Sequence, residues 1–330
     1  MNTSALNQAL RFAPLFRPYI WGGRRLETIL NKQIPNDGIW AESWEIVEHG
    51  HDQSLVAEGP FQGKSLRELI ESWPVAILGP HASHNDHFPL LLKFLDCQRV
   101  LSVQVHPGDS YAQKMNPPDL GKTEAWYVIE ADQESVIYAG LKEGVGLSEL
   151  TESIANGTIE GCLHSFTPKV GDCIFIPAGT VHALGAGLIV AEIQQASDTT
   201  FRLYDWNRLS GDGSPRPLHI VQALEVIEFE RGPVAPVIPT ATKDAGRKNL
   251  VTCDRFVLDE VRSDLSHFTL NGRFAIGTVV RGHATIHISG SSQSDCELSL
   301  GQSILLPAAI EAVSISLPAD SILLLARPPE

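Results

Sequence analysis

The sequence predicts a mainly β protein that contains two similar barrels and a few short helices. Apolar runs bounded by glycine and proline recur along the chain, as in Cys173 to Ile176, which lies between Gly171 and Pro177. The spacing of glycine and proline around this run returns in the segment 301–312. We therefore infer that the chain contains a duplicated barrel.

The two copies of this segment differ at the position that carries chemistry. The second copy keeps the first glycine and the proline, but alanine replaces the turn glycine and the histidine. Gly301, Pro307, Ala309 and Ala312 stand for Gly171, Pro177, Gly179 and His182. We expect that the second barrel has lost its ligand and that the first barrel holds the functional site.

A chain of 330 residues is long enough for two domains and a large core. We assign an N-terminal catalytic domain with helical insertions to residues 1–232 and a C-terminal degenerate domain to residues 249–330. The segment 233–248 between them is rich in proline, alanine and small polar residues, which is typical of a linker.

The composition argues against several classes of partner. The formal net charge of −14 disfavours nucleic acid and anionic membranes. The segment Met1 to Leu10 lacks a basic start followed by an apolar run, and no apolar stretch reaches the roughly 18 residues of a membrane span. The five cysteines form no C-x-x-C pair, which suits reduced thiols. We expect a cytoplasmic protein.

The first part of the chain predicts strands with one clear helix. Residues 40–47 alternate well enough for a short strand. Ser65 and Glu68 have the spacing of a capping box, which predicts a helix over 65–73 that ends at Pro74. Residues 88–96 form a continuous apolar run, which indicates a buried strand.

The elements that follow are predicted from apolar residues that recur either at the period of a helix or in the runs and alternation typical of strands. A helical turn is expected at 111–115, inside a polar insertion over 107–121, and helices are expected over 147–155 and 218–227. Strands are expected over 99–106, 126–130, 136–140, 173–176 and 188–194, with an alternating continuation over 197–206.

Four polar side chains are expected at the inward faces of these strands. Gln104 and His106 alternate with apolar residues and so share one face of a strand. Glu124 opens the next apolar run, and His182 follows the turn of the hairpin. Two imidazoles, a carboxylate and an amide oxygen without thiolates suit an open, catalytic site for a divalent cation. Gln104 is the weakest member, because it could instead hydrogen-bond a ligand or a water.

The spacing G-x5-P-x-G-x2-H over 171–182 resembles the second motif of the cupin superfamily. This resemblance implies a double cupin, that is, two β jelly-roll barrels. Four stretches narrow it: Leu-Ser-Val-Gln-Val-His-Pro, Gly-Lys-Thr-Glu-Ala-Trp-Tyr-Val, Pro-Ala-Gly-Thr-Val-His-Ala-Leu-Gly and Glu-Ile-Gln-Gln-Ala-Ser-Asp-Thr-Thr-Phe-Arg-Leu-Tyr-Asp-Trp. In this order, they resemble type I mannose-6-phosphate isomerases in their short bacterial form, over nearly the whole chain.

The resemblance assigns roles to individual residues. It implies one Zn²⁺ per chain, with other divalent metals as alternatives, held by Gln104, His106, Glu124 and His182. It implies an active-site arginine and lysine, two acidic residues and a serine near the phosphate, which are Arg202, Lys122, Glu192, Asp198 and Ser102. Larger members carry a histidine before the lysine, where this chain has Gly121, so no proton-transfer role can be transferred to that position.

The implied reaction interconverts mannose 6-phosphate and fructose 6-phosphate through a cis-enediolate. A cation would polarise the carbonyl, and a base must reach the hydrogens on C1 and C2. Glu192 is our first candidate for the base, since burial in the barrel would raise its pKa. Lys122 is the second candidate and could instead bind the substrate oxygens or the phosphate. Arg202 suits the phosphate, but a structural ion pair with Asp198 or Asp205 explains it equally well from the residues alone.

Other functions remain open at this level. They are an isomerase of another sugar phosphate, an Fe²⁺ cupin oxygenase and a non-catalytic phosphosugar-binding cupin. The glutamine at position 104 argues against the oxygenase, and the complete ligand set argues against the binding module. Trp44, Trp126 and Tyr127 either line the pocket or pack in the core. We expect a sugar phosphate as partner and a monomer or weak homodimer.

Overall fold

The computed structural model describes residues 6–210, 213–290 and 295–329. The first half of the segment Met1 to Leu10, in which we expect no secretion signal, and the outermost residues of both predicted domains lie outside these ranges. Strands are the main element of the described chain, so the prediction of a mainly β fold is confirmed. None of the described helices is long and apolar enough to cross a membrane.

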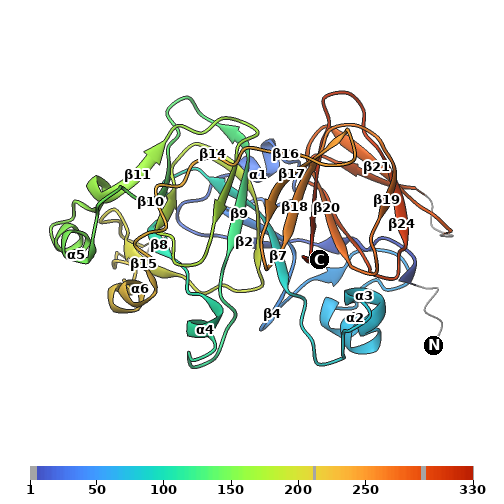
Figure 1. Ribbon diagram of the computed structural model, residues 1–330, viewed down its shortest axis with the longest axis horizontal. Coiled ribbons are helices and arrows are strands. Elements are labelled where there is room, and N and C mark those ends of the chain that lie inside the picture. Colours follow the sequence, from blue (N-terminus) through green and yellow to red (C-terminus); the bar gives the residue numbers. More distant parts are fainter. Residues whose placement is uncertain (1–5, 211–212, 291–294, 330) are drawn as a thin grey trace.

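Residues 15–204 form two facing antiparallel sheets, which we call the first half of the molecule (Figure 1). They enclose one core, to which Trp126 and Ile137 contribute from opposite sheets. The six-stranded sheet has the order β12 (Cys173–Ile176), β9 (Glu124–Ala131), β14 (Leu188–Gln195), β7 (Leu90–Cys97), β3 (Glu42–Ile46) and β2 (Leu15–Arg17). The five-stranded sheet has the order β11 (Leu163–Phe166), β10 (Ile137–Leu141), β13 (His182–Leu184), β8 (Val103–Val105) and β15 (Phe201–Tyr204).

Residues 240–327 form a second pair of antiparallel sheets, which we call the second half, with its own core. One sheet has the order β16 (Thr240–Ala241), β17 (Arg247–Thr252), β18 (Val257–Val261), β25 (Ile322–Arg327), β20 (Ala275–Arg281) and β23 (Ser303–Leu306). The other has the order β19 (Leu265–Thr269), β24 (Ala312–Ser316), β21 (His283–Ile288) and β22 (Cys296–Ser299). Strand β16 and the start of β17 lie within 233–248, so the expected linker contributes the edge of this sheet.

The duplicated segment forms equivalent hairpins in the two halves. Gly171 and Gly301 both have positive φ, at 92° and 80°, a conformation that favours glycine. Each precedes a four-residue strand, β12 or β23, and the next strand begins at His182 or Ala312. Both of these residues are buried, so the second half keeps the hairpin and places a methyl group where the first has an imidazole.

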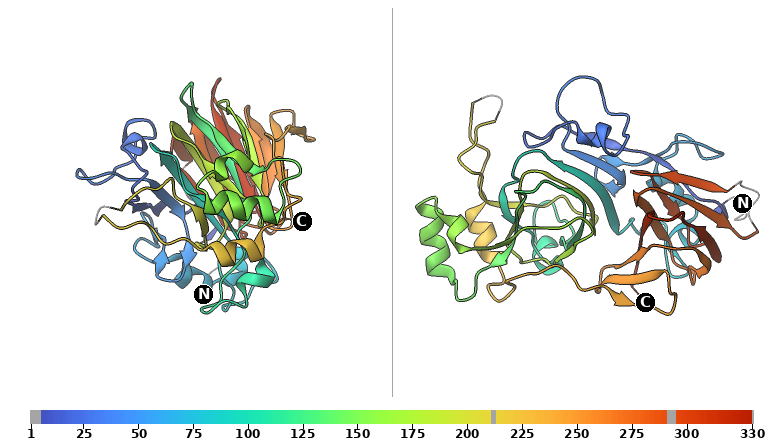
Figure 2. Two further views of the ribbon diagram at one scale, coloured as in Figure 1. Left: turned by 90° about the vertical axis from the view of Figure 1, so that its left-hand side faces the viewer. Right: turned by 90° about the horizontal axis from the view of Figure 1, so that it is seen from above.

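The two six-stranded sheets pack against each other, which Figure 2 shows from above. Strand β14 illustrates the consequence, because all eight of its residues are buried. Leu188 and Val190 face the core of the first half, whereas Ile189, Ala191 and Ile193 face the second half. A sheet that is covered on both faces explains why its strands read as continuous apolar runs.

Short helices lie around the sheets, and the clearest prediction among them is confirmed. The helices are α1 (Arg25–Thr28), α2 (Leu66–Ser72), α3 (Pro74–Leu78), α4 (Asp109–Ala112), α5 (Leu147–Ala155) and α6 (Ile220–Val226), with a 3₁₀ turn at Ile159–Cys162. The side chain of Ser65 accepts a hydrogen bond from Glu68 N, and Glu68 accepts one from Ser65 N, which forms the capping box of α2. Pro74 ends α2 as predicted, and it also begins α3, because the first turn of a helix needs no N–H.

Two small ladders and the cysteines complete the fold. Strand β1 (Phe12–Ala13) pairs with β6 (Leu55–Val56), and β4 (Glu48–His49) pairs with β5 (Asp52–Gln53). All five cysteines lie in the described ranges and are free thiols, and four of them are buried: Cys97, Cys162, Cys173 and Cys296. Burial raises the pKa of the Cys97 and Cys173 thiols, which keeps them protonated and unreactive.

Candidate metal and active site

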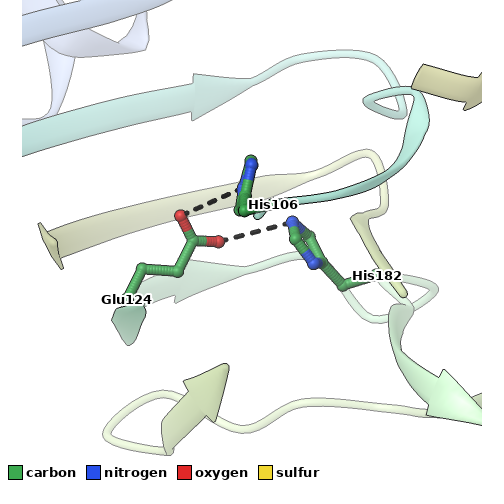
Figure 3. Close-up of side chains that lie close together, drawn as sticks. All are labelled: His106, Glu124 and His182. Carbon is green, nitrogen blue, oxygen red and sulfur yellow. Dashed lines mark ion pairs between the residues drawn. The ribbon is translucent and has the colours of Figure 1, made fainter. Parts of the chain in front are cut away.

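Three of the four expected ligands meet inside the first half of the chain (Figure 3). His106 follows β8, Glu124 begins β9 and His182 begins β13, so the three come from both facing sheets. The Nε2 atoms of His106 and His182 each lie 3.4 Å from an oxygen of Glu124, and one ligand atom from each residue falls within 4.8 Å of the others. This spacing suits a single cation that replaces these contacts.

Both imidazoles are oriented for ligation by hydrogen bonds on their other nitrogen. His106 Nδ1 lies 3.0 Å from Thr199 O, and His182 Nδ1 lies 2.9 Å from Thr180 O. A backbone carbonyl can only accept, so Nδ1 carries the proton and Nε2 keeps its lone pair. Burial and the neighbouring Lys122 lower the pKa of His106 to about 3, and burial lowers the pKa of His182. Both rings are therefore neutral, as ligands must be.

The carboxylate of Glu124 lies at the centre of the cluster. Both of its oxygens are buried without a hydrogen-bond partner. Lys122 supplies a positive charge beside it, with Nζ 2.8 Å from Glu124 Oε2. Burial alone would raise the pKa of Glu124, but the charge of Lys122 outweighs burial and holds the pKa of Glu124 well below its usual range. A buried, ionised carboxylate without hydrogen bonds fits the donor set of a divalent cation.

Gln104 lies beside this cluster, with its amide reversed relative to a ligand. It pairs across the sheet with His182 on β13 and with Arg202 on β15. Its Nε2 lies 3.3 Å from His182 Nε2, while its Oε1 accepts a hydrogen bond of 3.3 Å from Ser102 Oγ. Half a turn about the terminal bond would bring the oxygen to the place of the nitrogen, so the side chain reaches the cluster and its role depends on that rotation.

The cluster opens into a cavity of about 170 Å³ between the two facing sheets. On the six-stranded sheet, Trp126, Glu192 and Lys93 are cross-strand neighbours. On the other sheet, the row of His182, Gln104 and Arg202 lies opposite. Of the nine residues that the sequence assigns to the site, eight line the cavity: Ser102, Gln104, Lys122, Glu124, His182, Glu192, Asp198 and Arg202. The ninth, His106, lies directly behind it in the cluster.

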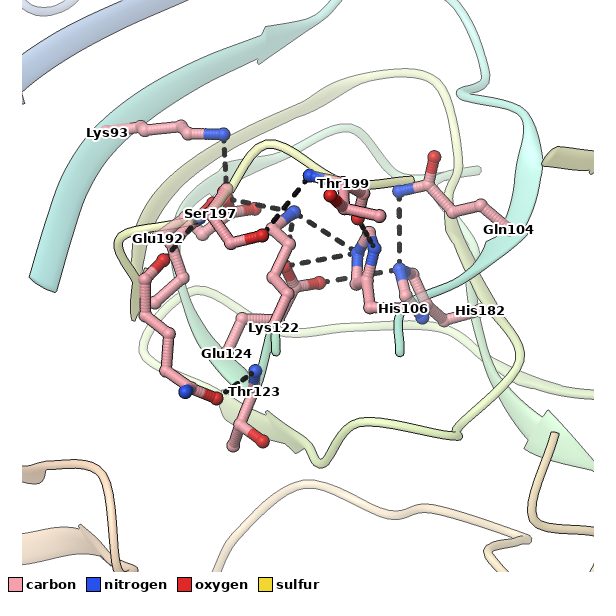
Figure 4. Close-up of polar contacts among 12 residues, drawn as sticks. Lys93, Gln104, His106, Lys122, Thr123, Glu124, His182, Glu192, Ser197 and Thr199 are labelled. Carbon is pink, nitrogen blue, oxygen red and sulfur yellow. Dashed lines mark hydrogen bonds and ion pairs between the residues drawn. The ribbon is translucent and has the colours of Figure 1, made fainter. Parts of the chain in front are cut away.

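Glu192 is buried beside charged groups in the cavity (Figure 4). Its Oε2 accepts a hydrogen bond of 3.1 Å from Trp126 Nε1, and its Oε1 lies 3.4 Å from Lys93 Nζ and 3.9 Å from Lys122 Nζ. Burial, together with the charge of Glu124, outweighs both lysines and raises the pKa of Glu192 to about 7. A carboxyl group with a pKa near neutrality can exchange protons under physiological conditions.

The far end of the cavity is basic. Arg202 donates to Ser102 Oγ at 3.2 Å and to Pro217 O at 2.8 Å. Asp205, one of the two acids proposed as its ion-pair partner, instead pairs with Arg208 and Arg216. Burial and the nearby charge of Arg216 lower the pKa of Arg202, because several positive groups lie close together at this end of the cavity. Two of these three guanidinium groups thus share the carboxylate of Asp205, whereas Arg202 hydrogen-bonds neutral oxygen atoms, and the excess positive charge suits an anion.

Several residues that line the cavity were not assigned to the site from the sequence. Tyr19 and Glu42 lie in the stretches Tyr-Ile-Trp-Gly-Gly and Ala-Glu-Ser-Trp-Glu, which also resemble the family, whereas Lys93 and Arg216 lie in segments without such a motif. The aromatic residues divide: Trp126 lines the cavity, whereas Tyr127 points the other way and donates to Glu260 Oε2 of the second half at 2.8 Å. Trp44 is buried beneath Lys93, 4.8 Å from its ammonium. Alternation along a strand separates Trp126 from Tyr127.

Gly121, where larger members of the resembled family carry histidine, lies directly against the backbone of Gly108 and Asp109. A Cβ atom at this position would lie 2.5 Å from Asp109 N, which is closer than atoms can approach. The segment before Lys122 therefore has no room for a side chain.

Three comparisons describe what the chain resembles. Residues 9–135 match the family model "Phosphomannose isomerase type I, catalytic domain". The chain is 34% identical over 307 residues to the probable mannose-6-phosphate isomerase GmuF of Bacillus subtilis, which covers 92% of this chain and 94% of that protein. It is 41% identical over 208 residues to a mannose-6-phosphate isomerase of Streptococcus mutans, covering 63% and 64%. The crystal structure of a Bacillus subtilis mannose 6-phosphate isomerase matches with a TM-score of 0.85 and 31% identity, over 96% of this chain and 99% of that chain.

The cluster predicts stoichiometric metal binding. We expect the purified protein to bind one divalent cation per chain, and His182→Ala to weaken that binding by more than about 100-fold, because one ligand is lost and Glu124 loses a neighbour. Metal content after dialysis and competition with a chelating dye measure both effects. The exposed His84 provides the control: His84→Ala should keep full metal content. Equal metal content in His182→Ala and the parent protein would rule out this cluster as the site.

Proposed function

Because the chain belongs to the type I phosphomannose isomerase family, we propose that it interconverts mannose 6-phosphate and fructose 6-phosphate. The observation that carries this function is a single cavity with a candidate metal cluster at one end and an excess of guanidinium groups at the other. A sugar phosphate has the matching polarity, with a carbonyl or hydroxyl pair at one end and a dianion at the other. Membership of an isomerase family disfavours the iron oxygenase and the non-catalytic binding module.

We propose Zn²⁺ as the cation, held by His106, Glu124 and His182, with Gln104 as a fourth ligand. The cluster offers nitrogen and oxygen donors without thiolates, and its buried carboxylate oxygens have no hydrogen bonds. A catalytic zinc site keeps a position open for a water or the substrate beside its protein ligands, and the ion can expand to five-coordinate. When bound, the cation supplies Lewis-acid polarisation of the substrate carbonyl.

The proton transfer falls to Glu192 in this proposal. Removing a proton from C1 or C2 needs a base whose pKa lies near the working pH, and burial brings the pKa of Glu192 to about 7. Trp126 Nε1 fixes one carboxylate oxygen, which leaves Oε1 as the atom that takes the proton. Lys122 remains the second candidate, because its Nζ lies between Glu124 and Glu192 and could take the proton as a neutral amine. As an ammonium, it would instead stabilise an enediolate oxygen.

The phosphate is held by the basic end of the cavity. Arg202 offers a planar, bidentate set of donors, and Arg216 lines the same cavity. The pairs of Asp205 with Arg208 and Arg216 hold these guanidinium groups in place without neutralising all of their charge. Ser102 Oγ, which Arg202 contacts, is a further donor within this group. A cytoplasmic location and a monomer or weak homodimer stay predictions from the sequence.

A coupled assay on mannose 6-phosphate tests the proposed function. We expect turnover in the metal-loaded protein, loss of turnover after a chelator and recovery when Zn²⁺ is added back. Parallel assays on glucose 6-phosphate and ribose 5-phosphate test whether the protein isomerises another sugar phosphate instead. Tight binding of mannose 6-phosphate without turnover in the metal-loaded protein would contradict the enzymatic assignment.

Arg202→Ala tests the phosphate end. The substitution removes a partly buried bidentate donor, so we expect kcat/KM to fall by about 100-fold or more while the metal stays bound. The uncharged sugar mannose, which lacks the dianion, should show no comparable loss in binding. Wild-type kcat and KM in Arg202→Ala would refute this assignment.

Glu192→Gln tests the base. The amide keeps the size and the hydrogen bond from Trp126 but accepts no proton, so we expect kcat to fall by about 10² to 10⁴ with metal content unchanged. Exchange of the substrate C1 or C2 hydrogen with deuterated solvent should be lost together with turnover. The matched variant is Lys122→Gln. If Glu192→Gln keeps exchange and Lys122→Gln loses it, the base is Lys122.

A further inference from the structure

We propose that Asp109, held by Arg255 from the second half of the chain, is a positioning residue for Lys122. The inference deepens the function proposed above and rests on it, because it concerns the lysine that the mechanism uses. Asp109 is the first residue of α4, and Arg255 lies in the loop between β17 and β18. Neither residue lines the cavity that holds the candidate site.

Lys122 needs precise placement because its ammonium has three neighbours in a small buried space. Its Nζ lies 2.8 Å from Glu124 Oε2, 3.1 Å from His106 Nε2 and 3.9 Å from Glu192 Oε1. Strand β9 begins only at Glu124, and one backbone hydrogen bond, from Gln195 N to Thr123 O at 3.2 Å, continues its pairing with β14. Other groups hold Gly121 and Lys122.

Three successive N–H groups of this segment each have an acceptor. Gly121 N donates to Asp109 Oδ1 at 2.7 Å, and Lys122 N donates to Pro107 O at 3.0 Å. Thr123 N, labelled in Figure 4, donates to Gln195 Oε1 at 3.0 Å. Side chains therefore hold the chain on both sides of the lysine.

These two side chains form one unit. Gln195 Nε2 donates to Asp109 Oδ1 at 3.0 Å, so a single carboxylate oxygen serves both Gly121 and Gln195. The other oxygen, Oδ2, lies 2.5 Å from Arg255 NH2. Because a Cβ at Gly121 would collide with Asp109, the two segments are in direct contact and cannot shift independently.

The contact with Arg255 gives the second half of the chain a part in the site. That half has alanine in place of the ligand histidine, yet it supplies the cation that orients Asp109. Arg255 borders a cavity of about 410 Å³ that is also lined by Asp109, Thr123 and Gln195. Removing its guanidinium therefore leaves no void in a packed core, and the positioning effect can be measured without collapse of the interface.

Kinetics of graded variants test the proposal. Asp109→Ala removes both hydrogen bonds and the ion pair, and we expect kcat to fall by about 10- to 100-fold with KM and metal content nearly unchanged. Asp109→Asn and Arg255→Gln each remove only the ion pair, so each should lower kcat less, and the double variant should be no worse than either single one. Arg255→Lys keeps the positive charge and should therefore keep most of the parent kcat.

A second measurement is independent of turnover. Labelling of Lys122 by an amine-reactive reagent, followed by peptide mass spectrometry, should be about 10-fold faster in Asp109→Ala than in the parent protein, since the lysine is released from its buried contacts. The control is Arg11→Gln, because Arg11 contacts Gln302 in the second half and no residue of the site. This variant should keep the parent kcat and labelling rate. If Asp109→Ala does not fold, Arg255→Gln carries both measurements.

The outcomes separate the two proposals. An inactive parent protein refutes the proposed function, whereas the labelling comparison still tests the position of Lys122. An active parent with parent-like kcat and labelling in Asp109→Ala overturns the positioning role. A loss in Arg11→Gln equal to that in Arg255→Gln also overturns it, because the effect would then come from a general weakening of the contact between the halves.

Discussion

The site depends on the burial of one ionised carboxylate. Both oxygens of Glu124 are out of solvent and lack hydrogen bonds, and an uncompensated buried charge costs several kcal/mol. Positive charge must therefore be present beside it, and Lys122 supplies it at 2.8 Å. The two neutral imidazoles cannot, because burial lowers the pKa of both. A divalent cation fits the same demand, since it would be bound by the carboxylate and both rings together.

The charge of Glu124 also shapes the behaviour of Glu192. Two buried carboxylates in one cavity cannot both be fully ionised at low cost, so the pKa values of the pair move apart. Glu124, close to Lys122, stays ionised, and Glu192 takes the raised pKa. In the proposed function, Glu124 would bind the cation and Glu192 would exchange the proton, within a protein whose overall charge is strongly negative.

Double coverage of the six-stranded sheet links this chemistry to the rest of the fold. One face of β14 carries Glu192 into the cavity, and the other face packs on the second half of the chain. The same alternation places Gln195 near the interface, where it meets Asp109 and the segment of Lys122. The second half thus covers and stabilises the outer face of the sheet that carries Glu192, although its own hairpin carries Ala312 instead of a histidine.

The local features of this protein can be predicted from its sequence, because they depend on neighbouring residues. Alternation gave the shared face of Gln104 and His106, the capping box gave the start of α2, and glycine and proline spacing gave both hairpins. The candidate ligands followed from the types of residue at the inward ends of strands. Their convergence was an expectation until the fold brought His106, Glu124 and His182 together.

Only the tertiary structure decided which groups of distant segments face one another. It decided that Trp126 faces the cavity and Tyr127 faces the second half, assigned Asp205 to Arg208 and Arg216, and brought Arg255 to Asp109 across the interface. It also set the order of pKa values, because burial and charge depend on distances in space. Sequence patterns record which side of its own strand a residue occupies, but the packing of two sheets determines what lies opposite.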